Sequence, residues 1–143
     1  MTHRRGRKPW RWVLAAYLAA LAVVGFWPTP VDAPAQGLLG QALAQLHAAG
    51  VPDWIDYNTL EASANVLLFV PAGFAAAAGF RSTWWQIAGC GALVSACVEL
   101  GQLLFLQHRY PSLVDVATNT GGALLGFFLA ERLLARRTGP DIS

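Results

Sequence analysis

Long apolar stretches separated by short polar links form the dominant pattern of this sequence. Four of them are each long enough to cross a lipid bilayer, which takes about 20 predominantly apolar residues in an α-helix. They cover about residues 10–27, 61–80, 84–106 and 115–134. The pattern predicts an all-α polytopic membrane protein built as a bundle of four transmembrane helices. We expect residues 1–143 to form a single integral membrane domain.

The first of these stretches also has features of a cleaved signal peptide, since a basic head precedes an apolar core. The run 10–27 is long for a signal-peptide core, however, and ends in Phe26-Trp27-Pro28. Tryptophans near both ends are typical of a helix whose ends lie at the membrane–water interface. We therefore expect this stretch to be retained as a membrane span.

The longest polar link, residues 28–60, contains an apolar pattern of its own. Within 37–49, the apolar positions 38, 39, 42, 43 and 46 follow a helical period. The link also carries four prolines and no lysine or arginine. We expect a short amphipathic helix here, in the first extracytoplasmic loop, which either lies on the membrane surface or caps the bundle.

Composition agrees with a membrane protein. The chain is 55% hydrophobic and 13% charged, whereas about 25% of the residues of a soluble domain are charged. The basic run RRGRK near the start could suggest nucleic acid, but a basic flank beside an apolar helix is typical of a topology signal. We expect no nucleic-acid partner. Cys90 and Cys97 are too few and wrongly spaced for a zinc site.

The basic residues predict an orientation, because lysine and arginine concentrate on the cytoplasmic side of membrane spans. With four spans and the N-terminus inside, nine of the ten lysines and arginines are cytoplasmic. The exception is Arg109, in the second outward link. We expect a multi-pass protein of the cell membrane with both termini in the cytoplasm.

Two helix surfaces are predicted to face protein. One is a stripe on the third span, made by Gly91, Ser95, Glu99 and Gln102 at steps of 4, 4 and 3. The other is the pair Gly122 and Gly126 on the fourth span, since small residues four apart suit a tightly packed helix pair.

Polar residues interrupt the apolar spans near one end of the predicted bundle. They are Glu61 and Asn65 in the second span, Glu99 and Gln102 in the third, and Asp115 and Asn119 in the fourth. A carboxylate in hydrocarbon costs about 2.5–3.5 kcal/mol on insertion scales, so such residues belong to a site or to a paired structural network. The predicted topology brings all six to one level beneath Arg109. We expect an outward-facing polar pocket, where Arg109 pairs with Glu99 or Asp115.

Three ordered motifs resemble the VanZ-like membrane proteins. They are ANVLLFVPAGF (64–74), SACVELGQ (95–102) and DVATNTGGALLG (115–126), with the lone Arg109 between the last two. The resemblance covers about residues 61–126. That family is named after a protein associated with low-level resistance to teicoplanin, a lipoglycopeptide that acts at the outer face of the membrane. Its recurring polar positions resemble Asn65, Glu99, Gln102, Arg109, Asp115 and Asn119 of this sequence.

The predicted pocket favours a protein that binds a membrane lipid or envelope glycolipid headgroup, or that modulates lipoglycopeptide susceptibility. Arg109 would meet a phosphate or carboxylate. The amides of Asn65, Gln102 and Asn119 would supply neutral hydrogen bonds, while Glu99, Asp115 and Glu61 complete the set of candidate ligand-binding residues.

Two other functions fit the same residues. In a membrane enzyme acting on an envelope lipid, Glu99 or Asp115 would be the general acid or base and Arg109 would stabilise an anion. A metal bound by Glu61, Glu99 and Asp115 is conceivable, but we expect neither a metal nor a cofactor. The third hypothesis is a proton-coupled carrier, which the apolar inner half of the spans disfavours unless a homo-oligomer forms the path.

Overall fold

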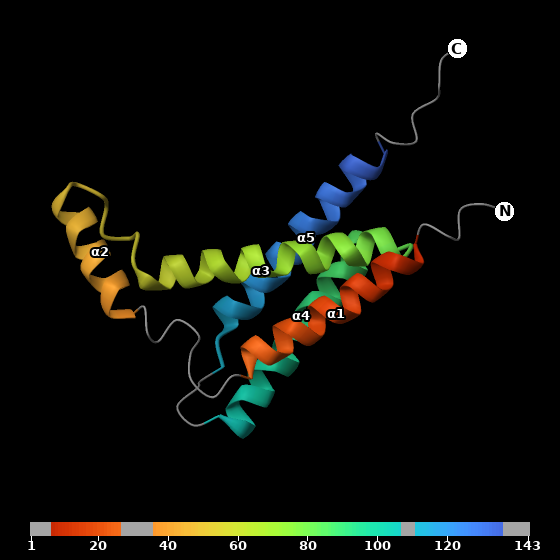
Figure 1. Cartoon of the computed structure of the whole chain (residues 1–143), viewed down its shortest axis with the longest axis horizontal. Helices are drawn as coiled ribbons and strands as arrows, with labels where there is room; N and C mark the ends of the chain where they lie inside the picture. The colour runs from red at the N-terminus through yellow and green to blue at the C-terminus, as the bar shows by residue number, and fades with distance from the viewer. Residues whose placement is uncertain (1–6, 27–35, 107–110, 136–143) are drawn as a thin grey trace, which may run out of the picture.

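The computed structural model describes residues 7–26, 36–106 and 111–135. These ranges form α1 (Lys8–Gly25), α2 (Gln36–Ala48), α3 (Tyr57–Gly79), α4 (Trp84–Phe105) and α5 (Leu113–Ala135), with no strand among them (Figure 1). The all-α prediction is confirmed. Each observed helix begins and ends within about one helical turn of its predicted bounds.

The four longest helices run alternately up and down. The start of α1, the end of α3, the start of α4 and the end of α5 lie at one end of the bundle (Figure 1). The most extensive helix pair is α3 with α5, followed by α4 with α5 and by α1 with α3. The helix α5 therefore lies between α3 and α4, and α1 packs along α3.

The close pairing of α3 and α5 depends on glycine. A Cβ at Gly122 would overlap the carbonyl oxygen of Val66, and a Cβ at Gly126 would overlap that of Val70. Two glycines one turn apart thus let the two backbones touch directly, which compensates for the absence of a hydrophobic driving force between helices in lipid. The predicted tight packing at Gly122 and Gly126 is confirmed.

The predicted stripe on α4 also faces protein. The buried residues of α4 are Ile87, Gly91, Ser95, Glu99 and Gln102, so the structure adds one residue, Ile87, to the predicted set. Large apolar residues of α4, such as Leu93, Leu100 and Leu104, are exposed on its other faces. This helix therefore turns its polar and small residues inward and its leucines outward, as expected of a helix whose outer surface meets lipid.

Within the described residues, three helices, α3, α4 and α5, are long and apolar enough to cross a membrane. The 18-residue helix α1 is not among them, and Lys8 and Arg11 in its first turns lower its mean hydropathy. The prediction of a membrane protein with four spans is thus supported for three of them. The first span remains a prediction.

Contacts near the basic end hold α1 against α3. Arg11 Nε donates a 3.0 Å hydrogen bond to the carbonyl of Gly79, the last residue of α3, and its guanidinium lies 4.6 Å from the centre of the Phe80 ring. A cation at the carboxyl end of a helix is stabilised by the free carbonyls there. Arg11 therefore caps the carboxyl end of α3, in addition to its predicted role as part of the topology signal.

Further along α1, Tyr17 Oη donates a 2.8 Å hydrogen bond to the carbonyl of Leu68. This carbonyl lies just before Pro71, which is inside α3 and cannot donate a backbone hydrogen bond to Leu67. The tyrosine thus meets α3 where its ladder of backbone hydrogen bonds is interrupted.

Candidate functional site

The predicted polar residues gather where α3 and α5 begin and α4 ends. We call this group the polar layer, and it consists of the side chains of Asn65, Ser95, Glu99, Gln102, Ser112, Asp115 and Asn119. Four of these side chains, on α4 and α5, are buried: Ser95, Glu99, Gln102 and Asn119. Since burying polar groups is costly without partners, the hydrogen bonds of the layer decide what it can do.

A short hydrogen bond joins α3 to α5 within the polar layer. Asn65 Nδ2 donates to Asp115 Oδ1 over 2.8 Å, and both side chains are half-buried. Such short side chains can meet only because the glycines of α5 bring the two backbones together. Asn65 thus orients the Asp115 carboxylate, which still has lone pairs free to accept other donors.

Glu99 joins the end of α4 to the start of α5. Its Oε2 accepts a 2.9 Å hydrogen bond from the backbone N–H of Ser112. The first N–H groups of a helix lack intrahelical partners and carry partial positive charge, which suits a carboxylate. Ser112 Oγ in turn accepts from the N–H of Asp115 at 3.2 Å, so Ser112 caps the start of α5.

The deepest contact of the layer joins α4 and α5 one turn further into the bundle. Asn119 Nδ2 donates a 2.8 Å hydrogen bond to Ser95 Oγ, whose residue is 0% exposed. Asn119 itself is 8% exposed, and its Oδ1 is buried with no hydrogen-bond partner among the residues that the structure describes. The layer therefore contains a buried acceptor that is not satisfied within that part of the chain.

Gln102 has a partner that the sequence did not predict. Its Nε2 donates a 2.7 Å hydrogen bond to the carbonyl of Gly25, the last residue of α1. Carbonyls at the end of a helix have no intrahelical donor, so this bond satisfies one of them. Gln102 thus links α4 to α1, away from the contact between Asn65 and Asp115.

Two further residues, Glu61 and Arg109, belong to the predicted site. Glu61 is exposed on α3, one turn before Asn65. Arg109 lies outside the described residues, and so does its predicted ion pair with Glu99 or Asp115. Within residues 7–26, 36–106 and 111–135, no cluster of three or more histidine, cysteine or acidic side chains could hold a metal ion.

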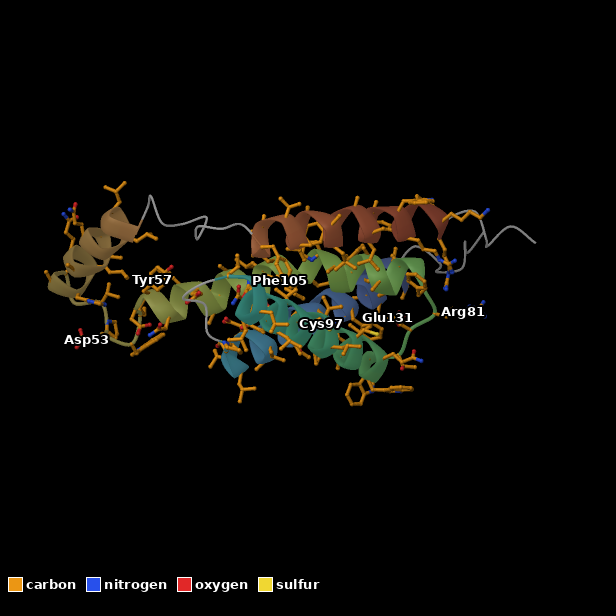
Figure 2. The ribbon with its side chains drawn as sticks, turned by 90° about the horizontal axis from the view of Figure 1, so that it is seen from below. Asp53, Tyr57, Arg81, Cys97, Phe105 and Glu131 are labelled. Carbon is orange, nitrogen blue, oxygen red and sulfur yellow. The ribbon has the colours of Figure 1, made fainter. Side chains whose placement is uncertain are left out.

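Charge is distributed unevenly between the two ends of the bundle. The described basic residues at the end opposite the polar layer are Arg7, Lys8, Arg11, Arg81 and Arg132. Figure 2 shows Asp53 and Tyr57 at one end of the molecule and Arg81 at the other, where Glu131 is the acidic exception. The polar layer therefore lies towards the acidic end.

The acidic end also contains a capped helix start. Asp56 Oδ1 accepts a 2.9 Å hydrogen bond from the N–H of Thr59 at the start of α3. This backbone hydrogen bond, together with one from the Thr59 side chain, lowers the pKa of Asp56 below its ordinary value. The cap fixes where α3 begins, two turns before Asn65.

Sequence reasoning missed three partners within the layer: the hydroxyl of Ser95, the carbonyl of Gly25 and the backbone N–H of Ser112. Ser95 was expected only as a small residue of the α4 stripe. Its spacing of four residues from Glu99 was a signal that could have placed it beside the polar group. The other two partners are backbone groups at helix ends, and no side-chain pattern reveals them.

The apolar helices and the buried polar layer between them are typical of a membrane protein with polar side chains inside its helix bundle. The family model described as VanZ/LLP1 matches residues 14–135. The chain therefore belongs to the VanZ/LLP1 family, and the resemblance predicted from three motifs is confirmed. No curated protein and no solved structure matches the chain.

Proposed function

We propose that the polar layer is the base of a site that opens towards the outer leaflet and binds the headgroup of a membrane lipid or envelope glycolipid. The observation that carries this proposal is the buried, unsatisfied Oδ1 of Asn119 beside a group of polar residues at one end of the bundle. A site for an envelope headgroup would also give the chain a means of altering lipoglycopeptide susceptibility, as the family resemblance implies.

The orientation in this proposal follows from the basic residues. Because lysine and arginine favour the cytoplasmic side, the end with Lys8, Arg11 and Arg81 would lie inside the cell. The polar layer would then lie near the outer leaflet. With α1 as a fourth span, both termini would be cytoplasmic, in line with the start of α1 and the end of α5 lying at the same end (Figure 1).

The chemistry of the layer favours a ligand with both acidic and donor groups. Asp115 and Asn119 offer acceptors for hydroxyl or ammonium hydrogens, one turn apart on α5. In the sequence Arg109 comes three residues before Ser112, the cap of α5, and would meet a phosphate or carboxylate of the same headgroup. A phosphate with hydroxyls or an amine nearby is the common chemistry of such headgroups.

A purely structural role is the main competing explanation, because polar side chains also join membrane helices. Each such hydrogen bond contributes only about 0.6 kcal/mol on average. An unsatisfied buried acceptor costs about 1–3 kcal/mol. Retaining Asn119 for the bond to Ser95 alone would therefore lose more free energy than it gains, which favours a further donor from a ligand.

Native mass spectrometry of the purified full chain tests the proposal. We expect a lipid from the envelope to be retained by the wild type and lost from Asp115→Asn and Arg109→Ala. Asp115→Asn keeps the size of the side chain but removes its charge. The matched control is Asp53→Asn, which changes an exposed acid at the same end of the molecule and should retain the lipid.

The proposal fails if all four proteins carry the same lipids while their thermal unfolding in detergent is alike. It also fails if Asp115→Asn and Arg109→Ala lose lipid only in proportion to a lowered unfolding temperature. Such a loss would reflect a less stable protein and no lost contact with the headgroup. In either case the polar layer would be structural.

A membrane enzyme is the second candidate, because two carboxylates lie at the start of α5. Glu99 accepts the Ser112 N–H, and Asp115 lies in the first turn. One of them could act as a general acid or base on a bound headgroup. Loss of turnover of the retained lipid in Glu99→Gln, with lipid binding intact, would favour this alternative. Binding and function that survive Glu99→Gln would favour a binding protein.

A further inference from the structure

Helix α2 lies apart from the rest of the molecule. Among the described helices it contacts α3 alone. Figure 1 shows it beyond the bundle, running across the direction of α3 near the start of that helix. The alternative in which this helix caps the bundle is therefore wrong, since it contacts none of α1, α4 and α5 in the described part of the chain.

Local contacts fix the position of α2 relative to α3. Its end is closed by hydrogen bonds from the N–H of Gly50 to the carbonyl of His47 and from the N–H of Val51 to that of Leu46, both 3.0 Å. Gly50 has a φ of 97°, which glycine adopts without strain at the end of a helix. His47 Nε2 lies 3.0 Å from the carbonyl oxygen of Ile55, just before α3. The helix is thus held at a defined angle.

The two sides of α2 differ in chemistry. The half-buried residues Leu39, Leu43 and His47 recur every four positions along one line of the helix. Beside this line, Leu38 and Leu46 are 69% and 46% exposed, with Ala42 between them.

The other side of α2 carries Gln41, Ala44 and Gln45, all exposed. The helix thus has an exposed apolar edge, formed by Leu38, Ala42 and Leu46, and a polar side that is centred about 100° around the helix from this edge. We call these the apolar edge and the polar side of α2.

We propose that α2 lies in the headgroup region of the membrane, with its apolar edge towards the acyl chains and its polar side towards water. Because α3 is long and apolar enough to cross the membrane, a helix running across it at its start lies along the membrane plane. The described part of this segment holds no lysine, arginine or acid between 36 and 48 that would oppose contact with lipid.

Trp54, 69% exposed in the link to α3, belongs to the same surface, since tryptophan favours the membrane interface. The exposed Leu60 continues the apolar surface from this link onto α3. The inference requires only that α3 spans the membrane, so it is independent of headgroup binding by the polar layer.

An interfacial α2 would set the depth of α3 in the membrane. Thr59 Oγ1 donates a 2.6 Å hydrogen bond to the carbonyl of Trp54, and Asp56 caps the same turn. The link is therefore joined to the first turn of α3. A helix held at the membrane surface would keep the start of α3 at a constant depth in the membrane. Asn65, two turns further along α3, would then also stay at a constant depth.

The test uses single cysteines in the full chain reconstituted in vesicles of phosphatidylcholine and phosphatidylglycerol. Cys90 and Cys97 are exposed on α4 and are first replaced by alanine. Ala42→Cys and Ala44→Cys then carry a nitrobenzoxadiazole label. They are a matched pair, since both are exposed alanines of one helix that point about 200° apart at about 100° per residue.

We expect the label at position 42 to emit at shorter wavelength and to be quenched by lipids brominated near the headgroup. The label at position 44 should be quenched mainly by aqueous iodide. Leu93→Cys, exposed on α4, gives the value for a label among acyl chains, and Asp53→Cys gives the value for water.

Equal iodide quenching at positions 42 and 44 would place α2 in water and overturn the inference. Equal quenching of both by brominated lipid would place the whole helix within the membrane and overturn it as well. Shielding of position 42 from iodide without any quenching of its label by brominated lipid would identify a protein contact in place of lipid.

Discussion

At the scale of single residues, the polar layer is a set of short contacts that differ in what they leave free. Glu99 and Gln102 form hydrogen bonds with backbone groups at the ends of neighbouring helices. Both side chains therefore have a structural role, with or without a ligand. Asn119 differs, because one of its two polar atoms has a partner in Ser95 and the other has none in the described chain. Asn119 is thus the residue at which structural and ligand-binding roles can be separated.

The variant Ser95→Ala/Asn119→Leu removes both partners together. The lost hydrogen bond is worth about 0.6 kcal/mol, whereas removing the unsatisfied acceptor recovers about 1–3 kcal/mol. We expect the free energy of unfolding in detergent to stay within about 1 kcal/mol of the wild type or to rise. Lipid retention should fall.

Ser95→Ala alone is the control for this prediction. It deprives Asn119 Nδ2 of its partner and should cost about 1–3 kcal/mol. A double variant that unfolds like the wild type and retains as much lipid would assign Asn119 to packing alone.

At the scale of helices, contact between α3 and α5 decides where the polar side chains meet. The two glycines of α5 bring its backbone against the carbonyls of Val66 and Val70. Asn65 lies next to Val66 on α3, and Asp115 lies two turns before Gly122 on α5. The distance between the helices therefore controls the hydrogen bond between Asn65 and Asp115.

Gly126→Ala should push α5 away from α3, because the added Cβ would lie 2.6 Å from Phe74 N as well as overlapping the Val70 carbonyl. We expect a loss of about 1–3 kcal/mol in the free energy of unfolding. Thermal unfolding in detergent measures it.

Gly121→Ala is the matched control, since a Cβ at Gly121 meets nothing within 4 Å. Alanine is the better helix former by about 1 kcal/mol, so this variant should be unchanged or more stable. Equal unfolding temperatures for the two variants would contradict the close approach of α3 and α5.

At the scale of the whole molecule, opposite charges at the two ends set the expected orientation. The described basic residues of α1 and α5 and of the turn after α3 lie at one end, and the polar layer lies towards the other. The positive-inside rule then predicts that the polar layer is accessible from outside the cell.

Cysteine labelling in whole cells checks this orientation. In a chain whose own two cysteines are replaced by alanine, Asp53→Cys should react with a membrane-impermeant maleimide in intact cells. Ser82→Cys, in the turn between α3 and α4, should react only after the cells are permeabilised. The reverse pattern would place the polar layer at the cytoplasmic side and exclude an outer-leaflet ligand.

The sequence by itself determined which segments are helices and which faces of them turn inward. Apolar runs of bilayer length, the steps of four and three residues on α4 and the glycine pair on α5 depend on helix periodicity, which is a local property. For this reason the inward-facing stripe of α4 and the close packing at Gly122 and Gly126 were predictable.

Only the tertiary structure decided which polar group meets which. Periodicity places Gln102 on the inward face, but the end of α1 lies opposite it, so it meets the Gly25 carbonyl. The pairing of Ser95 with Asn119 depends in the same way on the relative height of α4 and α5. The choice between membrane surface and bundle cap for α2 also depended on the turn at Gly50 and its contacts with α3. These are relations between distant segments, which no local pattern specifies.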